Sequence, residues 1–440
     1  MVKQNFCLKW QTSVNTDRKG EMMIKRADEI SQFWAYDSNC PTKSDLALLD
    51  NVQFIYELSL AELELMALGA DYATINGLRE FKINNKSDEL DEILIRRLSY
   101  FKSVDGRFTD YFHIIQKNRT RSVNQYLTHW IYPYKGKFHP QMIRALLNII
   151  GLQKGDTVFE PFSGSGTTAL ESQLLGINLI GIDISPLCVL QGKVKTQAIY
   201  VINDIIRLKN TLISKLKPSL FSQENNFYNV LDEIDNEKVR DFYKLARLLA
   251  VSDTSRRGRA FDQSFIKNLN LMIDSVKDYI EIADKLKLDL GDVKIDIGDA
   301  RNVNLPDNSI DGIITSPPYS IALDYVENDA HSLEDLGYKL ADIRENFIGV
   351  RGKGNERIKL YNADMEKSYK EMHRVLKPNK YAVIVIGNAI YQGQEVKTVE
   401  FTIEFMTKIG FSLEKNILKL IFGLYNVMKK ENILIFKKVK

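Results

Sequence analysis

The segment 155–188 restricts the fold of this chain more than any other. It contains two short apolar runs, each ending on a carboxylic acid, with closely spaced glycines between them. In chain order it predicts a buried strand at 157–160, a glycine turn at 161–168, a helix at 169–175, a second strand at 179–182 and then Asp183. Strand, glycine turn, helix, strand and acid is the order of a nucleotide-binding βαβ unit. We therefore predict an α/β fold built around a mostly parallel, Rossmann-like sheet.

The glycine turn indicates a ligand site at the start of the helix. Gly164 and Gly166 let the backbone approach a ligand closely, and the helix that follows presents free N–H groups and the positive end of its dipole. Asp183, at the tip of the second strand, is in place to accept hydrogen bonds from two ribose hydroxyls. The spacing of a P-loop and the GxGxxG pattern of nicotinamide enzymes are both absent from the turn. An ordinary tight turn between strand and helix is the alternative interpretation.

A second segment, 311–319, predicts a chemical site at the edge of a sheet. Its apolar residues predict a buried strand, which Ser316, Pro317, Pro318 and Tyr319 follow directly. Two consecutive prolines exclude a helix and central-strand pairing, so this tip is a stiff, extended turn. Carbonyl acceptors beside one hydroxyl and one flat aromatic face suit the exocyclic amino group of a planar base. A strand-ending turn without a chemical role is the alternative.

Charge and cysteine content exclude several classes of protein. Lys and Arg (60) nearly balance Asp and Glu (57), so any surface that binds nucleic acid has to be a local patch. Cys7, Cys40 and Cys188 are isolated, which indicates neither a disulfide framework nor a structural zinc site. The N-terminus lacks the apolar core of a signal peptide, and no apolar run is long enough to span a bilayer. We expect a soluble, intracellular protein that does not contact a membrane.

The pattern along the chain predicts four parts. They are a helical N-terminal unit of unknown role (1–120), the first part of the site-bearing domain (121–195), a charged helical insertion (196–290) and the second part of that domain (291–440). In the last part, a strand at 293–297 leads to Asp299 and Ala300. Two final strands, 417–422 and 432–436, are expected to place one antiparallel strand at the edge of the sheet.

The motifs resemble those of amino-group DNA methyltransferases, which use S-adenosylmethionine (AdoMet). Residues 160–168 are similar to the AdoMet-binding motif of that family, although Glu160 stands where the family usually has Asp. Residues 315–319 are similar to the family's catalytic motif, and 132–140 resembles the segment that closes over the methionine end of AdoMet. The three segments occur in non-permuted order. The resemblance covers roughly residues 128–440 and leaves the N-terminal unit unassigned.

The resemblance implies a class I methyltransferase sheet with an AdoMet site at its edge. Phe162 and the two glycines would line the methionine moiety, Asp183 would hold the ribose, and Asp299 would hold the adenine amino group. The full set implied for the cofactor is Lys137, His139, Glu160, Phe162, Gly164, Gly166, Thr167, Asp183, Asp299 and Ala300. No metal is implied, because a methyl group can leave a sulfonium without one. The insertion 196–290 is a candidate for target recognition.

The catalytic residues that the resemblance implies are Ser316, Pro317, Pro318 and Tyr319. The target base has to leave the duplex, because its amino nitrogen is inaccessible in the stack. Tyr319 would stack on the flipped base, while Ser316 and the carbonyl of Pro317 would accept the two amino hydrogens. The lone pair of the nitrogen then points at the methyl carbon. Serine at the first position is typical of family members that make N4-methylcytosine.

The resemblance also implies partners and a location, and it leaves alternatives open. It implies double-stranded DNA as substrate, a cognate restriction endonuclease as candidate partner, and the cytoplasm of a prokaryote, beside the nucleoid. N6-adenine specificity, an RNA amino-methyltransferase and a non-catalytic AdoMet- or DNA-binding regulator are the alternatives. C5-cytosine methylation is excluded because no cysteine directly follows a proline, and zinc-dependent deamination because the ligand spacing is absent.

Overall fold

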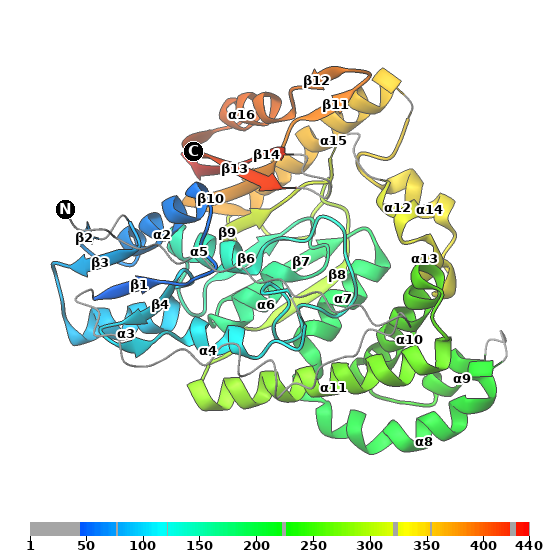
Figure 1. Cartoon of the computed structure of the whole chain (residues 1–440). Coiled ribbons are helices and arrows are strands. Elements are labelled where there is room, and N and C mark those ends of the chain that lie inside the picture. The colour runs from blue at the N-terminus through cyan, green and yellow to red at the C-terminus, as the bar shows by residue number, and fades with distance from the viewer. Residues whose placement is uncertain are drawn as a thin grey trace, which may run out of the picture. The chain divides into compact units, whose positions relative to one another are not determined.

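The computed structural model describes residues 45–75, 78–120, 122–221, 226–319, 324–352, 354–422 and 428–439, whose arrangement is shown in Figure 1. At its centre is a seven-stranded sheet in the order β13-β14-β10-β9-β6-β7-β8. In chain order its strands are β6 (Thr157–Glu160), β7 (Asn178–Asp183), β8 (Val293–Ile297), β9 (Ile310–Thr315), β10 (Leu376–Ile386), β13 (Phe411–Phe422) and β14 (Met428–Lys438). The predicted Rossmann-like sheet is confirmed.

All neighbouring strands of this sheet are parallel except those that pair with β14. β6 pairs in parallel with β7 and β9, β7 with β8, and β9 with β10. β14 is antiparallel to both β10 and β13. The expected antiparallel strand therefore exists, but it lies one place inside the edge, which β13 forms. The reason is that β14 pairs with β13 on one side and with the free side of β10 on the other.

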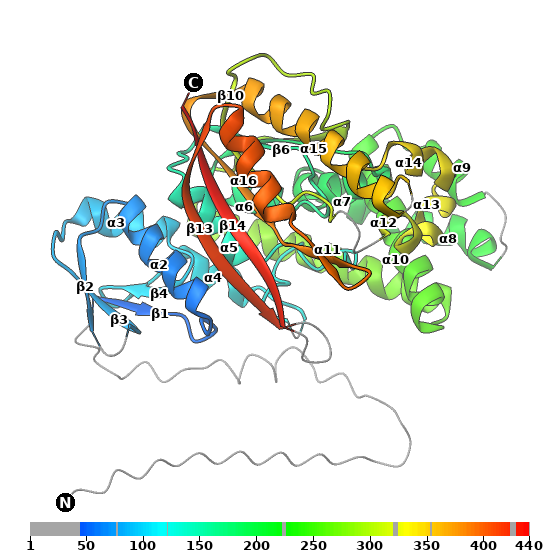
Figure 2. The same ribbon diagram turned by 90° about the horizontal axis from the view of Figure 1, so that it is seen from above.

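Helices cover both faces of the sheet. Side chains of β10 alternate between the faces, so that Val383 and Val385 join one hydrophobic core while Ala382 and Ile384 join another. Figure 2 shows α15 and α16 on one side of β13 and β14 and α2 on the other. The helices that pack on the two faces are α5 (Pro140–Ile149) and α6 (Thr167–Leu174) on the first, and α15 (Gly354–Val375) and α16 (Thr398–Lys408) on the second. A small hairpin of β11 (Ala389–Tyr391) and β12 (Gln394–Val396) follows β10.

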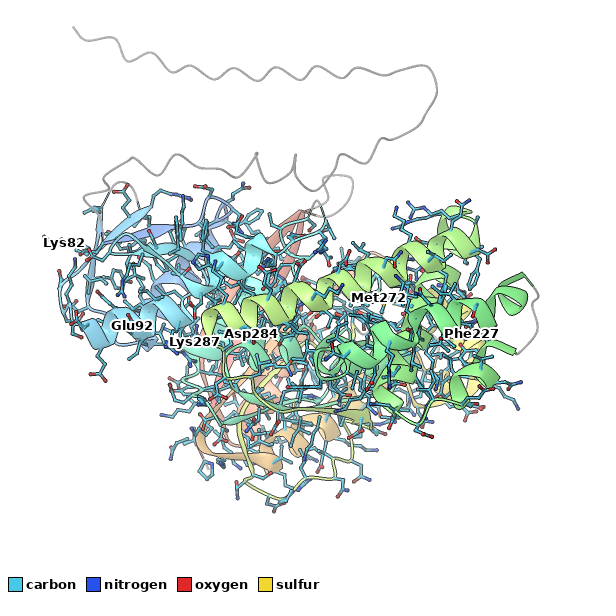
Figure 3. All side chains as sticks on the ribbon, turned by 90° about the horizontal axis from the view of Figure 1, so that it is seen from below. Lys82, Glu92, Phe227, Met272, Asp284 and Lys287 are labelled. Carbon is cyan, nitrogen blue, oxygen red and sulfur yellow. The ribbon has the colours of Figure 1, made fainter. Side chains whose placement is uncertain are left out.

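The segment 196–290 is helical, as predicted. After α7 (Pro186–Gln197) and the short η2 (Ala198–Tyr200) come α8 (Ile202–Phe221), α9 (Asn226–Asp232), α10 (Glu237–Arg257) and α11 (Phe261–Leu286). Figure 3 shows Met272 midway along α11, Asp284 near its end, and Phe227 on α9 beyond its other end. Met272 and Phe227 belong to a separate hydrophobic core, which also includes Val326 and Leu333. The insertion therefore packs against the residues that follow the Ser316–Tyr319 turn, namely α12 (Tyr325–Asn328), α13 (Ala330–Asp335) and α14 (Leu340–Asn346).

One half-buried ion pair joins the insertion to α13, and its loss should be costly. Arg247 of α10 donates to both carboxylate oxygens of Asp335, at 2.9 and 2.8 Å, and Tyr228 donates to the same carboxylate at 2.7 Å. Asp335→Asn leaves the Arg247 charge unpaired, so we expect a loss of about 3 kcal/mol in the free energy of unfolding. Urea unfolding measures it. The control is Asp289→Asn, which breaks the exposed Lys154–Asp289 pair and should cost less than about 0.5 kcal/mol. Equal losses in the two variants would contradict the prediction.

The N-terminal unit contains a sheet, so the prediction that it is helical is wrong for its described part. Five short strands pair antiparallel in the order β2-β3-β1-β4-β5. The elements are β1 (Leu46–Leu48), α2 (Ile55–Ala67), β2 (Tyr72–Ile75), β3 (Glu80–Ile83), α3 (Asp88–Arg97), β4 (Phe101–Val104), β5 (Arg107–Phe108) and α4 (Asp110–Gln116). The regularly spaced leucines from Leu58 to Leu65 do lie in a helix, α2. Strands of two to four residues, however, are too short to show a period of their own.

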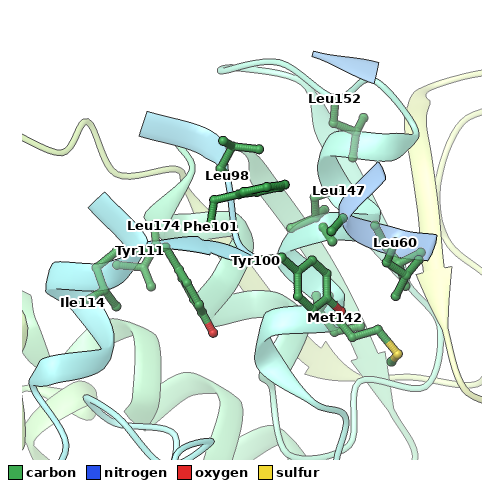
Figure 4. Close-up of a cluster of buried hydrophobic side chains, with 14 of the residues drawn as sticks. Leu60, Leu98, Tyr100, Phe101, Tyr111, Ile114, Met142, Leu147, Leu152 and Leu174 are labelled. Carbon is green, nitrogen blue, oxygen red and sulfur yellow. The ribbon is translucent and has the colours of Figure 1, made fainter. Parts of the chain in front are cut away.

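The N-terminal unit shares a hydrophobic core with the main sheet. Figure 4 shows Leu60, Tyr100 and Phe101 of that unit clustered with Met142 and Leu147 of α5. All five side chains are fully buried. Residues 42–440 accordingly form one compact unit, and the expected boundary near residue 120 does not divide them.

Candidate functional site

A cavity of about 590 Å³ lies where β6, β7, β8 and β9 end. Ligands of open α/β sheets bind outside the carboxyl ends of the strands, so this is the expected place for a site. Twelve predicted site residues line the cavity: Lys137, His139, Glu160, Phe162, Gly164, Thr167, Asp183, Asp299, Ala300, Ser316, Pro318 and Tyr319. Gly166 and Pro317 were also predicted and lie outside the lining.

The two glycines of the loop before α6 have different places. Gly166 is the N-cap of α6, with φ at +75° in the left-handed region. A Cβ on Gly166 would lie 2.7 Å from the Cα of Gly192 in α7, so only glycine fits between the two helices. Gly164, with φ at +48°, faces the cavity, and a Cβ there would come within 3.3 Å of the ring of Tyr134. Gly166 therefore allows α6 and α7 to pack closely, and Gly164 leaves space open in the cavity.

Asp183, the last residue of β7, has a carboxylate fixed by backbone N–H groups. Its Oδ2 accepts a hydrogen bond from Gly164 at 2.8 Å, and its Oδ1 accepts one from Ser185 at 2.9 Å. Burial raises the pKa of Asp183 and these hydrogen bonds lower it. The net result is a pKa of about 6, above the ordinary value. The carboxylate is ionised at neutral pH and has lone pairs left for the hydroxyls of a ligand.

Glu160, the last residue of β6, is buried more deeply than Asp183, with 1% of its surface exposed. Thr168 in the first turn of α6 donates to its Oε1 at 2.8 Å. Burial raises the pKa of Glu160 well above its ordinary value; the hydrogen bond from Thr168 opposes this rise, and the charge of Asp183 adds to it. Burial therefore favours the protonated form of the Glu160 carboxyl, which can donate a hydrogen bond as well as accept one.

Three basic side chains surround the glycine loop, and burial works against the charge of each. Lys195 of α7 donates to the carbonyl of Ser165 at 2.7 Å, and burial lowers its pKa well below the ordinary value. Lys137 donates to the carbonyl of His129 at 2.6 Å, and burial lowers its pKa to about 7. Burial, together with the nearby charges of Lys419 and Lys137, lowers the pKa of His139 to about 3. Lys195 was missed from the sequence because no motif contains it.

Asp299 follows β8 and is held by a neighbour that the sequence did not single out. The backbone N–H of Arg301 donates to its Oδ1 at 2.9 Å, and the guanidinium donates to its Oδ2 at 2.7 Å. Partial burial raises the pKa of Asp299, but the hydrogen bonds and charge of Arg301 outweigh it and hold the pKa below its ordinary value. Asp299 therefore faces the cavity as a carboxylate that already accepts hydrogen bonds from Arg301. Ala300, next to it, is buried.

The turn after β9 brings one hydroxyl and one aromatic ring to the cavity. The hydroxyl of Ser316 donates its hydrogen to the carbonyl of Val385 in β10 at 2.8 Å, so the lone pairs of its oxygen remain as acceptors. Pro317 is buried, whereas Pro318 and Tyr319 are half-buried and line the cavity. The hydroxyl of Tyr319 donates to Glu431.

A stack of three aromatic rings forms another wall of the cavity. Tyr134 stacks on Tyr325 with ring centroids 6.3 Å apart, and Tyr325 stacks on Phe347 at 5.9 Å, each with an interplanar angle of 20°. All three line the cavity and offer flat apolar surface to a planar ring. Tyr325 and Phe347 were missed because the rings come from segments far apart in the chain.

The N-terminal unit, to which the sequence assigned no role, also lines the cavity. Phe54, Tyr56 and Glu57 stand at the start of α2 and belong to the lining. Glu57 is buried, and its Oε2 accepts hydrogen bonds from the N–H groups of Gln53 and Phe54 at 2.8 and 3.0 Å. No sequence signal linked α2 to the glycine loop.

The described residues contain neither a candidate metal-binding group nor a candidate membrane-spanning helix. Within these ranges, no group of three or more His, Cys, Asp or Glu side chains is arranged to hold a metal ion. Among the same residues, no helix has both the length and the apolar character needed to cross a membrane.

A family model described as DNA methylase matches residues 10–192 of this chain. The match includes the glycine loop and Asp183 and ends before Ser316. It also includes most of the N-terminal unit, so the expectation that this unit lies outside the resemblance is wrong. The sequence reasoning missed it because the unit contains no ligand-binding motif.

Curated proteins with known names are similar to parts of the chain. The Type II methyltransferase M.BsoBI of Geobacillus stearothermophilus is 25% identical over 346 residues, which cover 61% of this chain and 68% of that protein. The Type II methyltransferase M.MjaII of Methanocaldococcus jannaschii is 37% identical over 134 residues, covering 30% and 23%. A tRNA (guanine(10)-N2)-dimethyltransferase of the same organism is 33% identical over 117 residues, covering 25% and 30%. The chain thus spans less than a third of the last two proteins. A solved SAM-dependent methyltransferase of Methanosarcina mazei is 13% identical, covering 66% and 94%, with a TM-score of 0.30.

Proposed function

We propose that this chain is an amino-group DNA methyltransferase and that it methylates the exocyclic N4 of a cytosine flipped out of double-stranded DNA, which the DNA methylase match and the two Type II relatives support. Ser316 is the observation that carries this proposal. Its hydroxyl hydrogen is committed to Val385, so its oxygen is available to accept a hydrogen bond from an amino group. Serine at this position, where Asp or Asn is typical of N6-adenine members of the family, favours cytosine.

In this proposal the catalytic turn acts by positioning the base. Tyr319 stacks on the extruded ring, while Ser316 Oγ and the carbonyl of Pro317 accept the two amino hydrogens. The nitrogen lone pair is thereby drawn out of conjugation and directed at the methyl carbon. When bound, AdoMet would supply the methyl group from its sulfonium: the N–C bond forms as the S–C bond breaks, the sulfur leaves as a neutral thioether, and the amino nitrogen loses one proton to solvent.

The residues at the glycine loop fit AdoMet chemically, which supports the roles we propose for them. Asp183 is ionised at neutral pH and suits the two ribose hydroxyls. Asp299 is likewise ionised and suits the adenine amino group. Gly164 leaves open the space that a Cβ would take beside Tyr134. The first turn of α6, beginning at Thr167, offers backbone N–H groups to the methionine carboxylate.

The pKa of Asp183 gives a pH dependence to test. With a pKa of about 6, the carboxylate gains a proton as the pH falls below 6 and then accepts ribose hydrogen bonds less well. We expect the titration of Asp183 to lower the affinity for AdoMet by up to about tenfold per pH unit below pH 6 and to have no effect above pH 7, where Lys137, with a pKa of about 7, titrates separately. Calorimetric titration between pH 5 and 8 measures it. Asp183→Asn should bind more weakly at pH 8 and lose this acid limb, and an unchanged limb in that variant would assign the titration to another group.

Two other substrates have support. N6-adenine methylation uses the same fold and cofactor, and the family includes both kinds of enzyme. The similarity to a tRNA (guanine(10)-N2)-dimethyltransferase over 117 residues favours RNA as a further candidate. M.BsoBI matches over a larger share of the chain, which is why we place DNA first.

The deciding experiment is to express the protein in a host free of methylases and analyse its nucleosides by mass spectrometry. We expect N4-methyldeoxycytidine that is absent when Ser316→Ala is expressed. N6-methyldeoxyadenosine would overturn the cytosine assignment and keep the family. A new methylated nucleoside in RNA alone would establish the RNA alternative. AdoMet binding by the purified protein, with no nucleoside modified, would favour a non-catalytic regulator.

We also propose double-stranded DNA as the macromolecular partner, the cytoplasm of a prokaryote as the location, and a role for the insertion 196–290 in target recognition. Because two relatives are named Type II methyltransferases, a cognate restriction endonuclease is the protein partner we propose. DNA from expressing cells should then resist cleavage by an extract of the source organism that cuts unmodified DNA. Cleavage of both DNAs would count against such a partner.

A further inference from the structure

The last two strands of the sheet bring an ion pair to the cavity beside Tyr319. The antiparallel register sets Lys419 of β13 directly opposite Glu431 of β14, and both residues line the cavity. Lys419 Nζ lies 2.8 Å from Glu431 Oε2, with side chains 12% and 18% exposed. The other carboxylate oxygen, Oε1, accepts the hydrogen bond of the Tyr319 hydroxyl. Glu431 therefore joins a lysine and the proposed stacking ring.

This arrangement restricts the ring of Tyr319 at both of its ends. Pro317 and Pro318, which precede Tyr319, have fixed φ angles and so restrict the direction in which the chain enters Tyr319. The hydroxyl at the far end is held by Glu431, and the ring edge lies close to Gly387, where a Cβ would come within 3.6 Å of Cε1. Burial raises the pKa of Tyr319, and the neighbouring Glu431 adds to the rise, so the phenol stays protonated and remains the donor.

We propose that Glu431 is a positioning residue that fixes the ring of Tyr319 at the angle at which its face receives the extruded base, and that Lys419 compensates the charge of Glu431. This inference rests on the proposed function, because it assigns Tyr319 the stacking role. Fixing the ring before the base arrives removes an ordering cost from the capture of the base.

A purely structural role would not require these two side chains. A half-buried ion pair adds little to stability compared with apolar residues of similar size, so two apolar residues would join β13 and β14 at least as well. The same strands carry another polar cross-strand contact, in which Asn432 donates to Asn416 at 2.6 Å, and this contact is exposed. It provides a control on the same hairpin.

The test compares Glu431→Ala, Glu431→Gln and the control Asn416→Ala, after the DNA target has been mapped with the wild-type protein. The amide of Gln can still accept the tyrosine hydrogen bond, so it should retain most of the function. We expect kcat/KM on the target duplex to fall about thirtyfold in Glu431→Ala and about threefold in Glu431→Gln. Asn416→Ala should match the wild type. AdoMet affinity should be unchanged in all three variants.

A duplex with a mispaired target base separates positioning from a general loss of folded protein. A mispaired base costs less to extrude, so weaker capture by Tyr319 matters less. The deficit of Glu431→Ala should shrink to less than about threefold on this duplex. A fold defect would lower the rates on both duplexes by the same factor.

The lysine is tested by a double-mutant cycle. Lys419→Met leaves the Glu431 charge unpaired, so we expect a loss of about tenfold in kcat/KM. Adding Glu431→Gln removes that charge and should bring the rate back to the level of Glu431→Gln alone. Additive losses would overturn the role of Lys419. Provided that the wild type is active, two results would overturn the inference. One is a Glu431→Ala variant as active as the wild type, and the other is a Glu431→Ala variant impaired by the same factor on both duplexes. A wild type that leaves DNA unmodified would instead overturn the proposed function.

Discussion

Ser316→Ala should reduce kcat for DNA methylation by at least about a hundredfold while leaving the affinity for AdoMet unchanged. The hydroxyl stands at the tip of β9 with its hydrogen already donated to Val385, so the amino group of the base loses a preorganised acceptor in the variant. The loss falls on kcat because this hydrogen bond strengthens as the nitrogen turns out of conjugation. Transfer of radiolabelled methyl groups to a duplex, together with calorimetric titration of AdoMet, measures both quantities.

Ser309→Ala is the matched control for this substitution. Ser309 directly precedes the other end of β9, where its hydroxyl donates to the carbonyl of Pro306 at 2.7 Å in an exposed position. Ser309→Ala also removes a serine hydroxyl next to β9, and its activity should be that of the wild type. If Ser316→Ala retained more than about a third of the wild-type kcat, Ser316 would not be the acceptor, because a lost catalytic hydrogen bond costs far more.

Gly166→Ala should destabilise the fold and weaken AdoMet binding strongly. The left-handed backbone costs a residue with a Cβ about 1 to 2 kcal/mol, and the new methyl carbon would lie 2.7 Å from the Cα of Gly192. The clash is with backbone, so α6 and α7 have to separate, which adds about 1 to 3 kcal/mol. We expect a loss of about 3 kcal/mol in the free energy of unfolding and at least a hundredfold loss of affinity. Urea unfolding and calorimetry measure the two effects.

Gly151→Ala separates the clash from the backbone strain. Gly151 has φ at +74°, within one degree of Gly166, but a Cβ there would meet no atom within 4 Å. It should lose only about 1 to 2 kcal/mol and bind AdoMet normally. Equal destabilisation in the two variants would show that backbone strain, and not contact between α6 and α7, requires glycine at 166.

Most elements that carry the predicted site could be read from the sequence, because each is set by residues adjacent in the chain. The strand at 157–160 and the strand ending at Asp183 agree with β6 and β7, and the strand at 293–297 agrees with β8. Buried parallel strands are continuous apolar runs that end abruptly, which makes their tips easy to locate. The tips of parallel strands meet at one edge of the sheet, and this brings Asp183, Asp299 and Ser316 to a single cavity.

The elements that were predicted wrongly depend on contacts between distant residues. The N-terminal strands β1 to β5 are too short to show an alternating hydrophobic pattern. They are strands because they pair with each other in an antiparallel sheet. β14 lies inside the edge because the free side of β10 accepts it, which is a property of the assembled sheet.

Local residue patterns are enough to predict the α/β fold, the glycine loop and the turn from Ser316 to Tyr319, because strand periodicity, glycine and proline act locally. The contacts that support these segments could not be predicted in this way, because they join residues far apart in the chain. Glu431 reaches Tyr319 through the register of a hairpin, and Tyr325 stacks on Tyr134 across almost two hundred residues of chain. Strand register and side-chain packing depend on the whole core, and no single segment of the sequence contains that core.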